Sequence, residues 1–346
     1  MELYEHGGDI YGDENILLDF SVSTNPLGMP DLVKQAIISH IPEYACYPDP
    51  CCRKLRAALA ERNGLEDSMV LCGSGAMELI FALCACFKPR STVVLAPTFS
   101  EYQRAAEVFG GQVKEHRLLE TGGFALTDSI LADLTPQVDL MFMCNPNNPT
   151  GQLADPVLLR KIAEACGENE ILLIIDECFL DFTRQGESML AKIMEYPNLM
   201  ILQAFTKIYA MAGLRLGTLY CADQERLANI AEFMPPWSVS AVAQAAGIAA
   251  LQEKGWMENT RRIVDKERGF MEAALGELGL VVYPSDANYL LIKSERPLYR
   301  PLKSRGILVR SGVNFSGLGE EYIRIGIQTR DNNRVLLDVM REVLNG

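Results

Sequence analysis

Short apolar runs without polar interruption alternate with helix-like stretches between about residues 68 and 222. We expect strands at residues 69–72, 92–96, 139–143, 171–175, 199–202 and 216–221. Because these runs lack the polar alternation of a half-exposed sheet, they indicate a mostly parallel α/β sheet with helices on both faces. Ligands bind such sheets at the carboxyl ends of the strands, so the residues that follow each run are the candidates for function.

The last third of the chain has a different pattern. A long, charged helix is expected at residues 257–278, followed by strands at 280–283, 289–292, 307–310 and 322–327 and a last helix at 332–344. We expect a large domain of residues 41–255 with a seven-stranded type of sheet. A smaller α+β domain of residues 256–346 is joined by an N-terminal arm of residues 1–40.

Length and charge exclude several classes of protein. The 346 residues suggest about two domains. The formal net charge of −13 argues against a nucleic-acid-binding surface. No apolar run approaches the roughly 18 residues of a membrane span, and the first residues lack the basic and apolar segments of a signal peptide. A cytoplasmic enzyme that binds neither nucleic acid nor membrane is therefore expected.

The cysteines and histidines predict no metal site. The ten cysteines contain no CxxC pair, and the three histidines, His6, His40 and His116, are far apart in the sequence. Reduced cysteines that serve as small packing residues are the simplest interpretation. Whether Cys178 has a further role is left open.

Two segments that follow expected strands suit anion or amide contacts. The turn Gly73-Ser-Gly75-Ala76 precedes a helix, whose N-terminus and backbone amides favour a phosphate. It is not the dinucleotide fingerprint, because Glu78 stands in place of the last glycine, and alone it also fits an ordinary strand–helix turn. The segment 145–151 contains two Asn-Pro steps, which fix an extended loop and can present an amide to a ligand. A simple surface loop is the alternative.

Two further segments carry a carboxylate and an amine. Asp176 ends a buried apolar run, where burying a carboxylate costs free energy unless the carboxylate is paired. A cationic ring nitrogen is a suitable partner, and capping of the next helix is the alternative interpretation. Lys207 is bounded by small and apolar residues, so desolvation can lower its pKa and make it a nucleophile. Arg215 offers a planar fork for phosphate. Taken singly, Lys207 also fits an ordinary exposed lysine.

Together the segments supply what pyridoxal 5′-phosphate requires, namely a Schiff-base lysine, a carboxylate for the pyridine nitrogen and a phosphate cradle. In this order they resemble the fold-type I, aspartate-aminotransferase-like family of pyridoxal-phosphate enzymes, over essentially the whole chain. The resemblance implies that Lys207 and Asp176 are catalytic and that both contact the cofactor. It implies further cofactor contacts from Tyr47, Gly75, Ala76, Phe99, Asn148, Thr206 and Arg215.

The resemblance also implies a substrate site and a homodimer. Arg324 would bind the substrate carboxylate and Arg310 a phosphate monoester, while His6, Asn25 and Gly28 would close the site from the arm. Tyr47 would reach the cofactor phosphate of the neighbouring subunit, so the active sites are shared. The chain departs from the common family pattern twice: Phe179 replaces a tyrosine that contacts the ring oxygen, and Ala204 replaces a serine or threonine near the phosphate.

Within the family, the chain resembles two groups, the threonine-phosphate decarboxylases and the histidinol-phosphate aminotransferases. The first is favoured by the Asp176-to-Phe182 segment with its phenylalanine, and by the segments 6–8, 19–21, 25–28, 205–215, 236–239 and 314–317. The expected reaction is decarboxylation of L-threonine O-3-phosphate to aminopropanol phosphate in cobalamin biosynthesis. The alternative is a 2-oxoglutarate-dependent aminotransferase of histidinol phosphate or aromatic amino acids. Phosphoserine is also open as a substrate, because one methyl group is worth only about 1–3 kcal/mol in a pocket.

Overall fold

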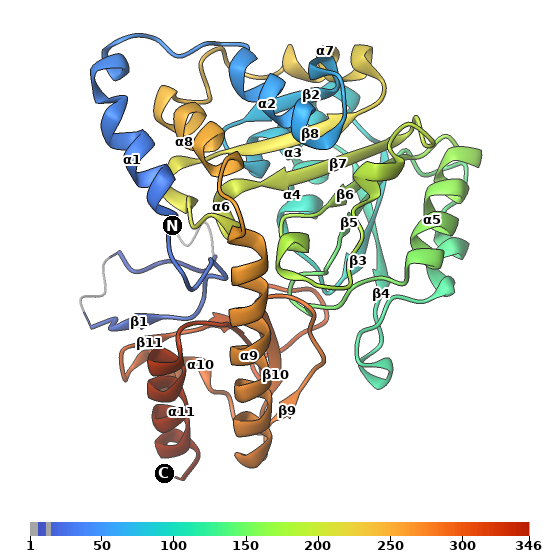
Figure 1. Cartoon of the computed structure of the whole chain (residues 1–346). Coiled ribbons are helices and arrows are strands. Elements are labelled where there is room, and N and C mark those ends of the chain that lie inside the picture. Colours follow the sequence, from blue (N-terminus) through green and yellow to red (C-terminus); the bar gives the residue numbers. More distant parts are fainter. Residues whose placement is uncertain (1–5, 12–14, 346) are drawn as a thin grey trace.

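The computed structural model describes residues 6–11 and 15–345 (Figure 1). The first five residues of the expected arm, on which the signal-peptide prediction partly depends, lie outside the described residues. None of the described helices combines the length and the apolar content needed to cross a membrane.

A seven-stranded sheet with the order β2-β8-β7-β6-β5-β3-β4 forms the centre of the larger part. Its strands are β2 (Val70–Gly73), β3 (Ser91–Ala96), β4 (Gln112–Arg117), β5 (Leu140–Cys144), β6 (Leu172–Asp176), β7 (Leu199–Ala204) and β8 (Gly217–Cys221). The β3–β4, β3–β5, β5–β6 and β6–β7 pairs are parallel, whereas β8 runs antiparallel to both of its neighbours. The expected α/β class with a mostly parallel sheet is confirmed, and β8 makes the sheet mixed.

Helices surround this sheet, and several of them start at clear sequence signals. They are α1 (Asp31–Ser39), α2 (Arg53–Asn63), α3 (Ala76–Phe87), α4 (Glu101–Val108), α5 (Pro156–Glu168), α6 (Phe205–Ile208), α7 (Gln224–Ala231) and α8 (Ala241–Leu251). At the start of α5, the Asp155 carboxylate accepts hydrogen bonds from the amides of Val157 and Leu158, and proline occupies the first helical position. The helix buries an apolar face that includes Leu158 and Ile162.

The smaller part is a four-stranded antiparallel sheet with the order β12-β13-β10-β9. Its elements are β9 (Val281–Val282), β10 (Tyr289–Lys293), α10 (Tyr299–Lys303), β12 (Arg310–Ser311), β13 (Tyr322–Gly326) and α11 (Arg330–Asn345). The N-terminal arm joins it through β1 (Leu18–Asp19), which pairs in parallel with β11 (Ile307–Leu308). The small sheet, the arm and the helices α10 and α11 share a separate hydrophobic core that includes Phe20, Leu290 and Ile325, to which the helix between the two parts also contributes.

The long helix α9 (Trp256–Glu277) connects the two parts, and Figure 1 shows it running from the large sheet down beside α11. Val264 belongs to the core of the large part, whereas Met271 and Leu275 belong to the core of the small part. One helix therefore contributes to both cores, and the expected domain boundaries at residues 40 and 255 stay a prediction.

The topology places the chain segments of interest at one edge of the large sheet. The carboxyl ends of β3, β5, β6 and β7 meet there, because these strands are parallel. The antiparallel β8 begins at the same edge, since Gly217 pairs with Ala204 at the end of β7 and with Gly73 at the end of β2. The turns after β2 and before β8 are thereby brought beside the lysine that follows β7.

Candidate active site

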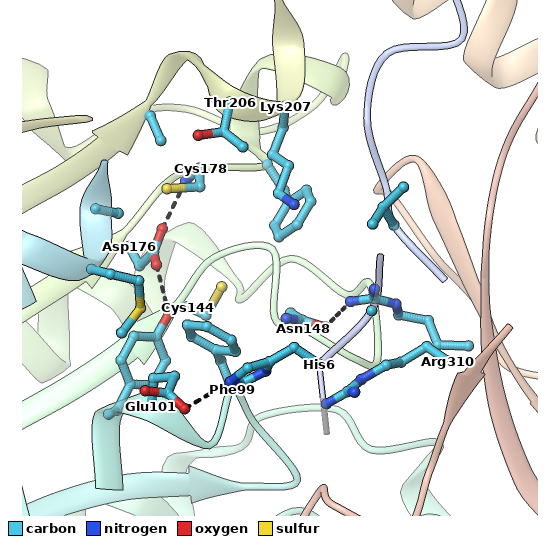
Figure 2. Close-up of a pocket in the computed structure, with 18 of the residues that line it drawn as sticks. His6, Phe99, Glu101, Cys144, Asn148, Asp176, Cys178, Thr206, Lys207 and Arg310 are labelled. Carbon is cyan, nitrogen blue, oxygen red and sulfur yellow. Dashed lines mark hydrogen bonds and ion pairs between the residues drawn. The ribbon is translucent and has the colours of Figure 1, made fainter. Parts of the chain in front are cut away.

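A pocket of about 430 Å³ lies at this edge of the sheet, between the large part, the arm and the small sheet (Figure 2). Most of the residues expected at the site line it: His6, Ala76, Phe99, Asn148, Asp176, Thr206, Lys207, Arg215, Arg310 and Arg324. They come from distant parts of the sequence, and the fold brings them into one cavity.

Asp176 lies at the floor of the pocket, at the carboxyl end of β6, and is 6% exposed. The hydroxyl of Tyr102 donates to its Oδ2 at 2.6 Å, and the backbone amide of Cys178 donates to its Oδ1 at 2.9 Å (Figure 2). Burial raises the pKa of the Asp176 carboxyl, and the hydrogen bonds from Cys178 and Tyr102 oppose that rise. A cationic partner such as a protonated ring nitrogen would stabilise the ionised form further.

Lys207 lies in the short helix α6, directly after β7, and its amine faces the pocket. Burial lowers the pKa of this amine to about 8, and the positive charges of Arg324 and Arg215 act in the same direction. The amine lies 5.7 Å from the centre of the Phe179 ring. Lys207 thus has a lowered pKa and an apolar neighbour, as a lysine that reacts as a neutral nucleophile requires.

Asn25 supports the backbone of the segment that carries Lys207 through hydrogen bonds. Its backbone amide donates to the carbonyl of Lys207 at 2.9 Å, and its side-chain amide donates to the carbonyl of Ile208 at 2.7 Å and to Thr260 at 2.8 Å. Neither Asn25 nor Gly28 is among the residues that line the pocket. The structure therefore places Asn25 as a support for the lysine backbone, whereas the sequence reasoning had expected it to contact substrate.

The turn between β2 and α3 forms a cradle together with Arg215. Gly75 has φ +80°, and a Cβ at this position would overlap the guanidinium of Arg215. A Cβ at Gly217 would lie 2.5 Å from the amide nitrogen of Ala76. No side chain caps the N-terminus of α3. The close approaches at Gly75 and Gly217 bring the first amides of this helix and the guanidinium of Arg215 around one confined space. Helix N-termini with free amides bind phosphate, and the cradle fits the phosphate of pyridoxal 5′-phosphate.

Two arginines of the small sheet lie directly opposite each other, because Arg310 on β12 pairs with Arg324 on β13. They are 6% and 7% exposed. Arg324 donates to Oδ1 of Asn148 and, at 2.7 Å, to the carbonyl of Ser21, while its buried Nε has no partner among the described residues. Arg310 donates to Asn314. Burial lowers the pKa of Arg324 to about 10. Like charges on opposite strands are unfavourable, and bound anions would relieve this repulsion.

Comparisons with known proteins agree with this geometry. The profile of the family described as "Aminotransferase class I and II" matches residues 15–340. The chain is 40% identical to the threonine-phosphate decarboxylase of Salmonella typhimurium, over 99% of this chain and 97% of that protein. It is 30% identical to an adenosylcobalamin biosynthesis bifunctional protein of Leptospira interrogans, over its whole length and 42% of that protein. The crystal structure of the histidinol-phosphate aminotransferase from Clostridium acetobutylicum superposes with a TM-score of 0.89 at 28% identity, covering 95% of this chain and 99% of that one.

The chain belongs to the class I and II aminotransferase family.

Both departures from the common pattern of this family lie at the pocket. Phe179 is 5% exposed and packs edge-on against Tyr289, with ring centres 4.9 Å apart. Because phenylalanine replaces the tyrosine that is common at this position, the ring beside the amine of Lys207 carries no hydroxyl. Ala204 lines the same pocket next to Thr206 and offers no side-chain donor there.

Tyr47, an expected cofactor residue, is not among the residues that line this pocket. It is 83% exposed, and its ring centre lies 5.0 Å from that of Trp237, which is 48% exposed. Its expected role in the site of a neighbouring subunit of this aminotransferase-family protein stays a prediction.

Sequence reasoning missed Tyr102 and Glu101, which lie next to each other in the first turn of α4. Glu101 lines the pocket and contacts His6 of the arm at 2.9 Å (Figure 2). Sequence reasoning named only Phe99 from this part of the chain. Glu101 and Tyr102 lie two and three positions after Phe99, and this closeness to an expected cofactor residue is the sequence signal that could have identified them.

Proposed function

We propose that this protein is a pyridoxal-5′-phosphate-dependent decarboxylase that converts L-threonine O-3-phosphate to aminopropanol phosphate for cobalamin biosynthesis. The observation that carries the proposal is the pair of buried arginines Arg310 and Arg324, which are partners on adjacent strands and line the same pocket as Lys207. A substrate with one carboxylate and one phosphate supplies an anion for each guanidinium. The names of the Salmonella and Leptospira relatives support the same reaction and pathway.

The residues present fit the cofactor. The first amides of α3, Thr206 and Arg215 would hold its phosphate, Asp176 its ring nitrogen, Asn148 its ring oxygen and Phe99 the face of its ring. When bound, pyridoxal 5′-phosphate supplies an electron sink for the charge that remains on Cα after a bond to it breaks. Asp176, buried and held by Tyr102, would keep the ring nitrogen protonated. Lys207 would bind the cofactor covalently and then return a proton to Cα.

Substrate orientation decides which bond to Cα breaks. Arg324 would hold the carboxylate with its guanidinium, and Arg310 would hold the phosphate at the other end of the substrate. Anchoring both ends fixes the rotation about the bond between nitrogen and Cα, and thereby selects loss of carboxylate or of hydrogen. Both guanidiniums are held by other protein groups, Asn148 and Ser21 for Arg324 and Asn314 for Arg310, so they are positioned before substrate arrives.

We also propose a homodimer in the cytoplasm. The exposed Tyr47 and Trp237 side chains support an interface through which Tyr47 reaches a neighbouring site. All ten cysteines are free, as is usual in a reducing compartment.

The deciding experiment is CO₂ release from O-phospho-L-threonine by the purified protein with pyridoxal 5′-phosphate and no keto acid. Release with an equal amount of aminopropanol phosphate is expected. Loss of both CO₂ release and the visible absorbance of the bound cofactor in Lys207→Ala is the expected control. If no CO₂ appears, but histidinol phosphate is turned over after 2-oxoglutarate is added, the protein is an aminotransferase and the proposal is wrong.

A further inference from the structure

Glu101 is a buried carboxylate at the wall of a pocket that otherwise favours anions. It is 4% exposed and lines the same cavity as the basic side chains Arg104, Lys207, Arg215, Arg310 and Arg324. A buried carboxylate is costly and repels an incoming phosphate unless other groups satisfy it. Glu101 takes no part in the hydrogen bond between Tyr102 and Asp176, so its presence calls for a separate reason.

Both oxygens of Glu101 are already engaged. Oε1 lies 2.9 Å from Nε2 of His6, and Oε2 lies 2.7 Å from Nη1 of Arg104. Burial raises the pKa of Glu101, but the hydrogen bonds with His6 and Arg104 outweigh this and leave the pKa below its usual value. The carboxylate is therefore ionised at neutral pH, and its charge is shared between one residue of its own helix and one residue of the arm.

The first described residues of the arm have a second anchor further along the arm, at Ser21. The amide of Gly8 donates to Oγ of Ser21 at 2.7 Å, and Gly7 lies so close to the Ser21 carbonyl that a Cβ would overlap it. That carbonyl also accepts the hydrogen bond from Arg324. Residues 6–8 thus extend from Glu101 on the large part to Ser21 beside the small sheet, and both His6 and Gly7 line the pocket.

We infer that Glu101 is a positioning residue: it fixes the arm across the pocket and holds His6 beside Arg310, where the two side chains receive the phosphate of the substrate. Figure 2 shows His6 between Glu101 and Arg310. The hydrogen bond at Nε2 sets the orientation of the imidazole, while Arg104 compensates the remaining charge of the carboxylate. The binding of the substrate phosphate by His6 and Arg310 rests on the proposed function, whereas the fixing of the arm by Glu101 does not.

Amide hydrogen exchange at Gly8 tests the fixing of the arm without any activity. In Glu101→Ala the exchange rate is expected to rise about ten- to hundredfold, because a hydrogen bond to a charged group is lost. His6→Ala removes the same bond without changing α4 and should have the same effect. Glu107→Ala, at an exposed position on the same helix, is the matched control and should leave Gly8 unchanged. Unchanged exchange at Gly8 in both Glu101→Ala and His6→Ala overturns the inference.

Steady-state kinetics test the effect on substrate. Glu101→Ala is expected to raise KM for O-phospho-L-threonine about ten- to hundredfold with a smaller change in kcat, and to leave the cofactor absorbance unchanged. The double variant with His6→Ala should be no worse than His6→Ala alone, since the two side chains act as one unit. Additive effects would contradict the assignment. If the unaltered protein does not release CO₂, the proposed function fails, while the exchange experiment still decides whether Glu101 fixes the arm.

Discussion

Lys207 shows how the surroundings of one side chain change its chemistry. Its amine lies in a pocket that also holds Arg215 and Arg324, and burial together with these charges lowers its pKa from 10.5 to about 8. A lysine with a lowered pKa is neutral, and so nucleophilic, at a pH where an exposed lysine is almost fully protonated. The amine is therefore prepared for covalent binding of an aldehyde near neutral pH.

We predict that the rate of cofactor incorporation into the apoenzyme rises with pH with a midpoint near 8, because only the neutral amine reacts. Stopped-flow absorbance after mixing with pyridoxal 5′-phosphate measures this rate. Arg324→Gln removes a positive charge and should shift the midpoint upward, whereas Lys192→Ala, at an exposed site, should not shift it. A midpoint near 10.5 in the unaltered protein would contradict the prediction.

Tyr102 gives the second prediction at this scale. Its hydroxyl donates to Asp176, while its ring stacks on Phe142 with centres 5.1 Å apart. Tyr102→Phe keeps the stack and removes one of the hydrogen bonds that hold the pKa of Asp176 down. We expect kcat to fall about tenfold or more, because a hydrogen bond to a charged group is worth about 1.5–3 kcal/mol. Tyr283→Phe, which removes a hydroxyl that donates to the Glu120 carboxylate and does not line the pocket, is the control; an equal loss in both variants would show a general effect on the fold.

The contacts of Tyr102, Glu101 and Asn25 could not be predicted from the sequence, because each joins residues that are far apart in the chain. Tyr102 lies 74 residues from Asp176 in the sequence, and Glu101 lies 95 residues from His6. The placement of Lys207, Asp176 and Arg215 at one pocket could be predicted, since each lies close to the end of an apolar strand and has a residue type with specific chemistry, while their roles stay predictions. The expectation for Asn25 was drawn from family resemblance alone, and the structure places it behind the lysine.

At the scale of elements, strands were predicted wherever burial on both faces leaves an uninterrupted apolar run. β5, β6 and β7 are of this kind. β4 was missed, because it lies at the edge of the sheet and its exposed and partly buried residues alternate. The antiparallel direction of β8 was also missed, because an apolar run reads the same in either direction. Pairing partners are set by the connections between strands, which the local pattern does not contain.

The contact between β8 and the β2–α3 turn gives a prediction for these elements. Gly217→Ala places a methyl group 2.5 Å from the amide nitrogen of Ala76 and 2.6 Å from the carbonyl carbon of Gly75. The phosphate cradle must shift, so we expect the dissociation constant of pyridoxal 5′-phosphate to rise at least about tenfold, at a stability cost of about 1–3 kcal/mol. Equilibrium titration and thermal unfolding measure the two effects.

Gly269→Ala is the matched control for this change. Gly269 is exposed in the middle of α9, and a Cβ there meets nothing within 4 Å. Alanine should stabilise the helix by about 0.5–1 kcal/mol and leave cofactor affinity unchanged. If Gly217→Ala bound the cofactor as tightly as Gly269→Ala, the cradle would not depend on the close approach of β8.

At the scale of the whole molecule, exposed apolar side chains gather around the segment that carries Tyr47. Ile38 and Ile41 are 68% and 59% exposed, and Tyr47 packs against the exposed Trp237. Exposed apolar clusters of this kind mark interaction sites, and a second copy of the chain is the partner that would bring Tyr47 to a phosphate cradle.

We predict a dimer of twice the 38.3 kDa chain mass by sedimentation. Ile41→Asp should weaken the dimer and reduce cofactor affinity together, because both depend on the same contact. Met194→Asp, at a site 69% exposed elsewhere on the surface, should change neither. A monomer that binds the cofactor with full affinity would contradict the shared site and leave Tyr47 without a role in it.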